Sequence, residues 1–143
     1  MPFLKFKKVR DVKTPEYGNR YAAGMDFFVP NDYIPLTLDT NESALIKSGI
    51  IVELDPEYCL LGVNKSSRGS SGLVVGACLI DSDYRGEIHL NVWNVSKLPI
   101  VIKPGEKLVQ FIYQKAEQPS LIEVDHITET NRGKGAFGST GLS

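Results

Sequence analysis

Apolar and polar residues alternate with a period of two in short runs along most of the chain, which is the pattern of half-buried β-strands. Turn residues such as Asp55-Pro56 and Lys103-Pro104-Gly105 separate the runs. The chain contains no amphipathic helical pattern of useful length, so it predicts an all-β sandwich or barrel. The predicted strands are Phe3–Val9, Ile34–Leu38, Ile50–Leu54, Tyr58–Val63, Ile88–Trp93, Ile100–Ile102, Leu108–Tyr113 and Leu121–Val124.

From about Asp125 onward the apolar pattern fades into Thr, Glu, Asn and Gly. This predicts one β domain over residues 1–124 and a C-terminal arm with a flexible, glycine-rich lid over residues 125–143. A chain of 143 residues fits a single domain and can bury roughly two-thirds of the surface of its unfolded state.

Composition narrows the possible partners. Sixteen basic and 17 acidic residues give a formal net charge of −1, so no overall field attracts nucleic acid or a membrane surface, and any phosphate binding must be local.

Cys59 and Cys78 lie in apolar runs, and neither a signal-peptide pattern nor an 18-residue apolar stretch occurs. We expect free thiols and a cytoplasmic location, or the host-cell cytoplasm if the protein is viral. His89 and His126 lack neighbours at metal-ligand spacing.

The last twelve residues, Arg132–Ser143, interleave four glycines with one arginine, one phenylalanine and a Ser139-Thr140 pair. Glycines let backbone N–H groups approach an oxyanion, Arg132 offers a rigid fork of donors, and Phe137 supplies a flat apolar face. This composition suits a lid over a phosphorylated ligand with a planar base, although a disordered terminal tail has a similar composition.

A second cluster, Asp81–Gly86, follows the apolar run Leu73–Ile80 and precedes an alternating strand. Turn chemistry alone accounts for Asp and Gly in such a segment. It does not account for Tyr84 and Arg85 beside paired acids, so the turn is a candidate site.

With these clusters in view, the chain resembles the trimeric dUTP pyrophosphatases (dUTPases) from about Ala22 to Gly141. Five motifs occur in the family's order: Ala22–Asp26, Lys65–Ser67, Leu79–Glu87, Gly105–Gln110 and Arg132–Gly141. Each alone is common, but five in sequence are specific. The resemblance implies a jelly-roll-like β-barrel, a C-terminal arm that crosses onto a neighbouring subunit, and a homotrimer whose active sites are shared between subunits.

The resemblance also implies a reaction, the hydrolysis of dUTP to dUMP and pyrophosphate with Mg²⁺. Asp81 would be the general base for the attacking water, while Asp83 would have the structural role in the turn. The Tyr84 ring would lie against the deoxyribose and reject a 2′-hydroxyl. Backbone groups of the segment that holds Gly76, Ala77 and Cys78 would pair with uracil.

The remaining motifs would surround the triphosphate. Asp26 would contact Mg²⁺ through water, and Gln110 would donate near the α-phosphate or orient the water. In the lid, Phe137 would stack on uracil and Arg132 would pair with the γ-phosphate. The other residues expected at the phosphates are Ser66, Ser67, Gly138, Ser139 and Thr140.

The second motif departs from the family pattern. Lys65 stands where the family usually has arginine, and lysine neutralises phosphate without forming a bidentate clamp. Arg68 restores a guanidinium if its loop reaches the phosphates; alternatively, both side chains belong to a solvated basic loop. Cys78 and Ala136 each occupy a position where glycine is common.

Two other functions are alternatives to the hydrolysis of dUTP. A dCTP deaminase has a loop similar to Lys65–Arg68, but it needs a glutamate where this chain has Asn91, and it lacks the Phe-Gly-Ser-Thr-Gly lid. A non-catalytic deoxynucleotide-binding regulatory module would keep the pocket without turnover, and the presence of Asp81 argues against it.

Overall fold

The computed structural model describes residues 1–138, and the predicted all-β fold class is confirmed. The only helix in these residues is the short α1 (Ser66–Ser70). The strands are β1 (Leu4–Lys8), β2 (Glu16–Tyr17), β3 (Gly24–Phe28), β4 (Leu36–Leu38), β5 (Ser43–Lys47), β6 (Ile50–Leu54), β7 (Tyr58–Asn64), β8 (Leu73–Val75), β9 (Leu79–Ile80), β10 (His89–Asn94), β11 (Ile100–Ile102) and β12 (Lys107–Lys115).

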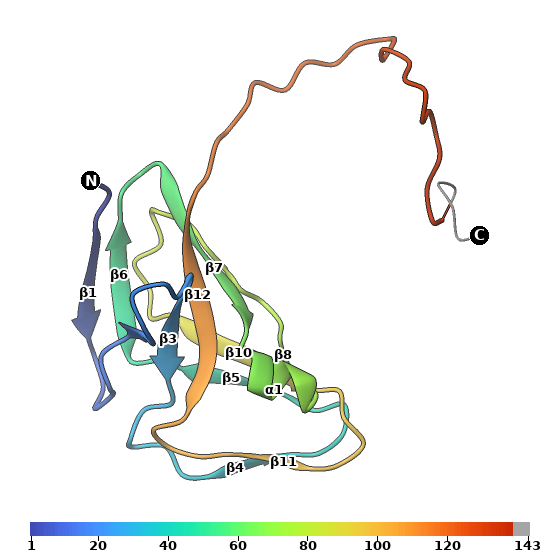
Figure 1. Cartoon of the computed structure of the whole chain (residues 1–143). Helices are drawn as coiled ribbons and strands as arrows, with labels where there is room; N and C mark the ends of the chain where they lie inside the picture. The colour runs from blue at the N-terminus through green and yellow to red at the C-terminus, as the bar shows by residue number, and fades with distance from the viewer. Residues whose placement is uncertain (139–143) are drawn as a thin grey trace.

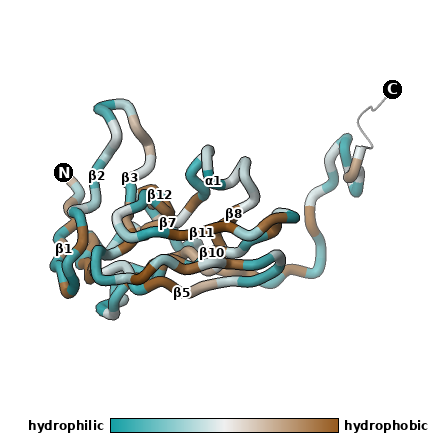
Figure 2. The backbone as a smooth tube through the Cα atoms, turned by 90° about the horizontal axis from the view of Figure 1, so that it is seen from below, coloured by the Kyte–Doolittle hydropathy of each residue, from teal (hydrophilic) through white to brown (hydrophobic). Residues whose placement is uncertain are grey.

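Within the described residues the strands form four antiparallel sheets that pack into one body (Figure 1). The largest sheet has the order β2-β3-β12-β7-β9, and a second has the order β5-β10-β8. Two smaller sheets, β1-β6 and β11-β4, complete the body. Hydrophobic stretches concentrate in the strands, while hydrophilic residues dominate many of the connecting loops (Figure 2).

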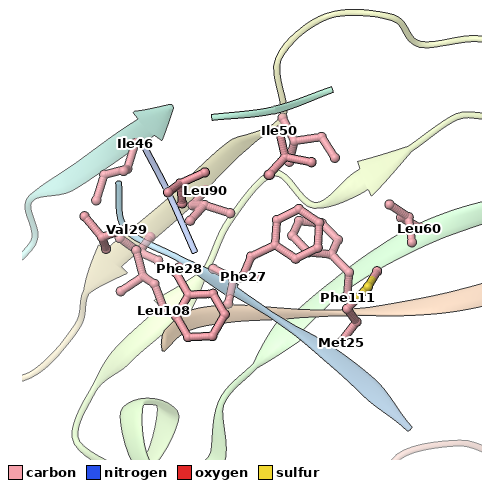
Figure 3. Close-up of a cluster of buried hydrophobic side chains, with 14 of the residues drawn as sticks. Met25, Phe27, Phe28, Val29, Ile46, Ile50, Leu60, Leu90, Leu108 and Phe111 are labelled. Atoms are coloured by element: carbon pink, nitrogen blue, oxygen red, sulfur yellow. The ribbon is translucent and has the colours of Figure 1, made fainter. Parts of the chain in front are cut away.

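The core lies between the sheets and is centred on β3 and β12 (Figure 3). The rings of Phe27 and Phe111 pack with centroids 4.7 Å apart at 57°. A tilted aromatic pair of this kind contributes about 0.5–1.5 kcal/mol beyond its buried area. These two rings anchor the strands that carry the first and fourth motifs.

A β-bulge at the start of β12 decides which side chains of the fourth motif face away from the core. The register between β12 and β3 shifts between Lys107 and Val109, so Leu108 and Val109 are both buried. Beyond the bulge, Gln110 pairs with Asp26 in the register. Cross-strand partners point to the same face of a sheet, so Gln110 and Asp26 share the face opposite Phe111.

The strand predicted at Leu121–Val124 is wrong. The last strand ends at Lys115, and Ala116 donates to the Glu57 carbonyl at 2.8 Å as the chain leaves the body. Leu121 is 95% exposed because the segment has no partner strand among the described residues of its own chain. The division at residue 124 between domain and arm stays a prediction. Figure 1 shows the chain extending away from the body after β12, and the described part of this segment, residues 116–138, is called the arm from here on.

The turn that carries Asp81 connects strands of two different sheets. The preceding strand β9 pairs with β7, whereas the following strand β10 pairs with β5 and β8. The turn therefore joins two sheets and is not a hairpin. In the part of the chain that the structure describes, no helix is long and apolar enough to span a membrane.

Candidate functional site

Residues of the third motif line a pocket of about 190 Å³ at the point where the two larger sheets meet. Four residues predicted for the site lie together here: Ala77, Cys78, Asp81 and Tyr84. The remaining lining residues are Leu45, Leu79, Ile80, His89 and Asn91. One acid, one aromatic ring and a stretch of backbone are thus brought to one cavity, and such a mixture of apolar wall and few polar groups is typical of small-molecule sites.

The turn is rigidly built around Tyr84. Its hydroxyl donates to the Glu87 carbonyl at 3.0 Å, and its backbone N–H donates to the Asp81 carbonyl at 3.2 Å. A Cβ at Gly86 would overlap the phenol ring, so a larger residue there would displace the Tyr84 side chain. Asp81 itself is exposed, and its carboxylate accepts no hydrogen bond from the described residues. It is therefore open to a water molecule.

Glu87 fastens the end of this turn to the N-terminal part of the chain. Its carboxylate accepts hydrogen bonds from Arg10 Nε and from the Gly49 N–H, both at 2.8 Å. Burial alone would raise the pKa of Glu87, but these two bonds and the Arg10 charge hold that pKa below its ordinary value. The Glu87 carboxylate therefore remains ionised and keeps its bond to Arg10.

The backbone from the last residue of β8 to the start of β9, residues Val75–Cys78, is here called the pocket segment. Its first three amides are already hydrogen-bonded: Val75 N–H donates to Asn64 Oδ1 at 2.7 Å, and Gly76 N–H donates to the Asn91 carbonyl at 2.9 Å. Ala77 N–H donates to Asn91 Oδ1 at 2.7 Å. Two asparagines that the sequence did not single out as site residues therefore shape this segment.

Cys78 ends the pocket segment. Its carbonyl accepts the Gly62 N–H at 2.8 Å, and its Cβ packs over Gly62, where a side chain would not fit. The Cys78 N–H has no acceptor among residues 1–138. The cysteine side chain is thus accommodated by a glycine on β7, while its amide has no partner within the described residues.

A second cluster surrounds Asp26, which lies in the middle of β3 and not at a strand end. Only 3% of its surface is exposed. Lys65 Nζ lies 2.7 Å from Oδ1, and Lys107 Nζ lies 3.2 Å from Oδ2. Burial alone would raise the pKa of Asp26, but the hydrogen bonds and charges of these two lysines hold it below the ordinary value. Asp26 is therefore ionised at neutral pH.

Gln110 joins this cluster from β12. Its Nε2 donates to the Asn64 carbonyl at 2.8 Å, and its amide lies against Gly24, where a Cβ would overlap it. Gly24 and Asp26 belong to the first motif, Asn64 directly precedes the second, and Gln110 ends the fourth. The fold therefore brings three of the five motifs to one face of the largest sheet.

Arg68 is not a solvated loop charge. Its guanidinium forms an ion pair with Glu106 of the fourth motif, and only 25% of its side chain is exposed. Lys65 is similarly enclosed, with 24% of its side chain exposed. The alternative of a solvated basic loop is therefore wrong, because Lys65, directly before α1, and Arg68, within it, each lie against an acid of another motif.

The lid is described as far as Gly138. Arg132 Nε donates to the Gly135 carbonyl at 2.8 Å, and Phe137 is fully exposed with φ at 52°. Neither side chain lines the pocket of the third motif. The predicted residues Ser139 and Thr140 lie outside the described part of the chain.

A protein-family model described as dUTPase matches residues 10–141. The chain belongs to the dUTPase family. A deoxyuridine 5′-triphosphate nucleotidohydrolase from Caldanaerobacter subterraneus subsp. tengcongensis is 38% identical, and the alignment covers 97% of each chain. An enzyme of the same name from Idiomarina loihiensis is 36% identical over 94% of this chain and 91% of its own length.

Solved dUTPase structures share the fold. A mutant dUTPase of Staphylococcus bacteriophage 80alpha with dUpNHpp superimposes with a TM-score of 0.83 at 23% identity, covering 98% of this chain and 99% of the other. A mutant dUTPase from phage phi11 of S. aureus, described as revealing the coordination of a structural Mg(II) ion, gives a TM-score of 0.78 at 22% identity over 89% and 99%. The jelly-roll-like dUTPase fold expected from the motifs is confirmed.

Sequence reasoning missed several residues of this dUTPase-family site. Lys107 shares Asp26 with Lys65, and Glu106 binds Arg68; both lie inside the recognised fourth motif. The sequence shows that Lys107 and Glu106 are charged. It does not show their partners, which lie far away in the chain, on β3 and α1 respectively. No group of three or more metal-ligating side chains occurs in residues 1–138.

Proposed function

We propose that the chain hydrolyses dUTP to dUMP and pyrophosphate in a Mg²⁺-dependent reaction. One observation carries the proposal: Asp81 and Tyr84 line a single pocket together with the pocket segment. A carboxylate open to water, a ring that closes the sugar side and a stretch of backbone for the base are the parts that this reaction requires.

In this mechanism Asp81 accepts a proton from a water molecule as that water attacks the α phosphorus. The bond between the α phosphorus and the bridging oxygen breaks, and pyrophosphate leaves in line. Lys65, Arg68 and Arg132 offset the negative charge that develops on the phosphates. Tyr84 leaves a 2′-hydroxyl neither space nor a partner, which selects deoxyribose.

Mg²⁺ fits this site as an ion held mainly by the nucleotide. Asp26 is ionised, but both of its oxygens are engaged by lysines, so it contacts an ion more readily through water than directly. When bound, Mg²⁺ neutralises phosphate charge and fixes the conformation of the triphosphate. Asp26 would orient the ion's water shell, while Lys65 and Lys107 keep the carboxylate charged.

We also propose that the chain works as a homotrimer with shared sites. The described residues that we expect to lie near the phosphates do not line the pocket that holds Asp81. These residues include Asp26, Lys65 and Gln110. The arm exposes Leu121 and other large apolar side chains, which are Ile122, Val124 and Ile127. A neighbouring subunit would cover these side chains and receive the lid.

The edge of β1 is a candidate receiver for the arm. Among the described residues β1 pairs only with β6, so its second edge is open. This strand carries Lys5, Lys7 and Lys8, while the arm carries Glu123 and Asp125. Opposite charges and an unpaired edge favour the addition of a strand from another subunit.

Arg68 should contribute to phosphate binding. Each charged hydrogen bond to phosphate contributes about 1.5–3 kcal/mol, so Arg68→Ala is expected to raise KM for dUTP by about 10- to 100-fold. Glu106→Gln is the matched variant: it breaks the same ion pair but keeps the guanidinium, and KM should stay within about threefold. Steady-state kinetics of both variants test this. An equal rise in KM for both would mean that Arg68 acts only through Glu106.

One assay tests the proposed function. The protein is incubated with Mg²⁺ and dUTP, dCTP, dTTP or UTP, and the products are separated by ion-exchange chromatography. We expect dUMP and pyrophosphate from dUTP alone, with loss of turnover when EDTA removes the metal. Formation of dUTP from dCTP would support a deaminase, and the absence of any product would support a non-catalytic module. The cytoplasmic location stays a prediction.

A further inference from the structure

The side chain of Asn91 on β10 binds the pocket segment where the segment leaves the sheet. β8 pairs with β10 as far as Val75, and the ladder continues through the Gly76 N–H to the Asn91 carbonyl. The next amide, Ala77, donates at 2.7 Å to the side chain of the same residue, through Oδ1. Asn91 thus binds two consecutive amides of the pocket segment.

The partners of Asn91 determine the orientation of its amide group. Nδ2 donates to the Ala44 carbonyl on β5 at 3.1 Å, while Oδ1 accepts from Ala77. A backbone N–H can only donate and a carbonyl can only accept, so the reversed amide would lose both bonds. Asn91 is therefore fixed between the strand β5 and the pocket segment.

Gly76 is part of the same arrangement. A Cβ at this position would overlap the Asn91 amide. The backbone of the segment lies directly against that side chain, and the half-buried Asn91 also lines the pocket. The amide therefore forms part of the pocket wall and supports the pocket segment.

We propose that Asn91 is a positioning residue that makes the site selective for uracil over cytosine, an inference that rests on the proposed dUTP hydrolysis. With Val75, Gly76 and Ala77 engaged, Cys78 carries the one amide of the pocket segment that has no acceptor in residues 1–138. Uracil presents a carbonyl oxygen where cytosine presents an amino group. A segment that cannot rotate its peptide groups keeps a donor facing that position, which suits uracil and opposes cytosine.

Removing the Asn91 side chain should weaken this selection. In Asn91→Ala, the Ala77 N–H loses its acceptor and its peptide is free to rotate, so a carbonyl can turn toward the amino group of cytosine. The ratio of affinities for dUpNHpp and the corresponding imido analogue of dCTP should fall by about 10- to 100-fold, the effect of one unpaired polar group. Any loss of dUTP hydrolysis should appear mainly as a rise in KM, because the lost interaction acts on binding.

Three variants are compared by calorimetric binding of both analogues with Mg²⁺ and by amide hydrogen exchange at Ala77. Asn91→Asp keeps an acceptor for Ala77 but loses the donor to the Ala44 carbonyl, so it should retain more of the wild-type selectivity than Asn91→Ala. Asn91→Ala should lose selectivity, and its Ala77 amide should exchange about tenfold faster. Asn94→Ser is the control. It removes a buried amide of the same strand that bonds to the Leu38 and Leu98 carbonyls outside the pocket, so it should lower Tm without changing selectivity.

The outcomes separate the two proposals. Unchanged selectivity or unchanged Ala77 exchange in Asn91→Ala, with an active wild type, would overturn the role of Asn91 alone. Equal loss of selectivity in Asn91→Asp and Asn91→Ala would also overturn it, because the acceptor for Ala77 would then be irrelevant. A wild-type protein that binds neither analogue and hydrolyses no dUTP would overturn the proposed function, and the base selection with it.

Discussion

Asp81→Asn is expected to lower kcat for dUTP by about 10²–10⁴-fold, the usual contribution of a general base. The amide has nearly the shape of the carboxylate but cannot accept the proton of the attacking water. Asp81 is exposed and accepts no side-chain hydrogen bond within the described residues, so the substitution should not disturb the fold. Nucleotide affinity should also be retained, which calorimetry with dUpNHpp can measure.

Asp83→Asn is the matched control for that experiment. Asp83 lies two residues away in the same turn and is also exposed, but it does not line the pocket that holds Tyr84. Its replacement should leave kcat within about threefold of the wild type. If Asp81→Asn were as active as Asp83→Asn, the assignment of Asp81 as the base would be wrong.

Deleting Arg132–Ser143 is expected to abolish most dUTP hydrolysis and to leave the proposed trimer intact. The deleted residues include the predicted phosphate partner Arg132 and the stacking ring of Phe137. The residues that remain include the apolar part of the arm around Leu121 and Ile127, which we expect to bind the neighbouring subunit. Without closure of the lid, the phosphates are not positioned and water is not excluded, so the loss should appear mainly in kcat.

Light scattering and steady-state kinetics test this deletion together. Lys134→Ala is the point control: it changes an exposed side chain of the same segment that has no assigned role, and it should retain activity. A full-length protein with a monomeric mass at assay concentration would contradict the shared-site proposal. Full activity of the shortened chain would contradict the role of the lid.

The period-two pattern was sufficient to predict most of the strands and the all-β class, because a strand with one buried face shows its position by alternation. It missed β3, whose five residues are all buried and therefore do not alternate, and it also missed the strands β2, β5, β8 and β9. The pattern wrongly predicted a strand at Leu121–Val124. Alternation shows that a segment can bury one face, but it does not show whether a partner strand exists in the same chain.

The sequence by itself determined the family and the chemistry available to the site. Five ordered motifs identified Asp81, Tyr84 and Asp26 as candidates, because motif residues are recognised by type and spacing. The tertiary structure alone decided which of these residues meet. It paired Asp26 with Lys65 and Lys107, enclosed Arg68 against Glu106, and placed the amide of Asn91 on the pocket segment. Such contacts join residues up to tens of positions apart, and their geometry depends on strand register and on a single bulge in β12, which no local pattern in the chain encodes.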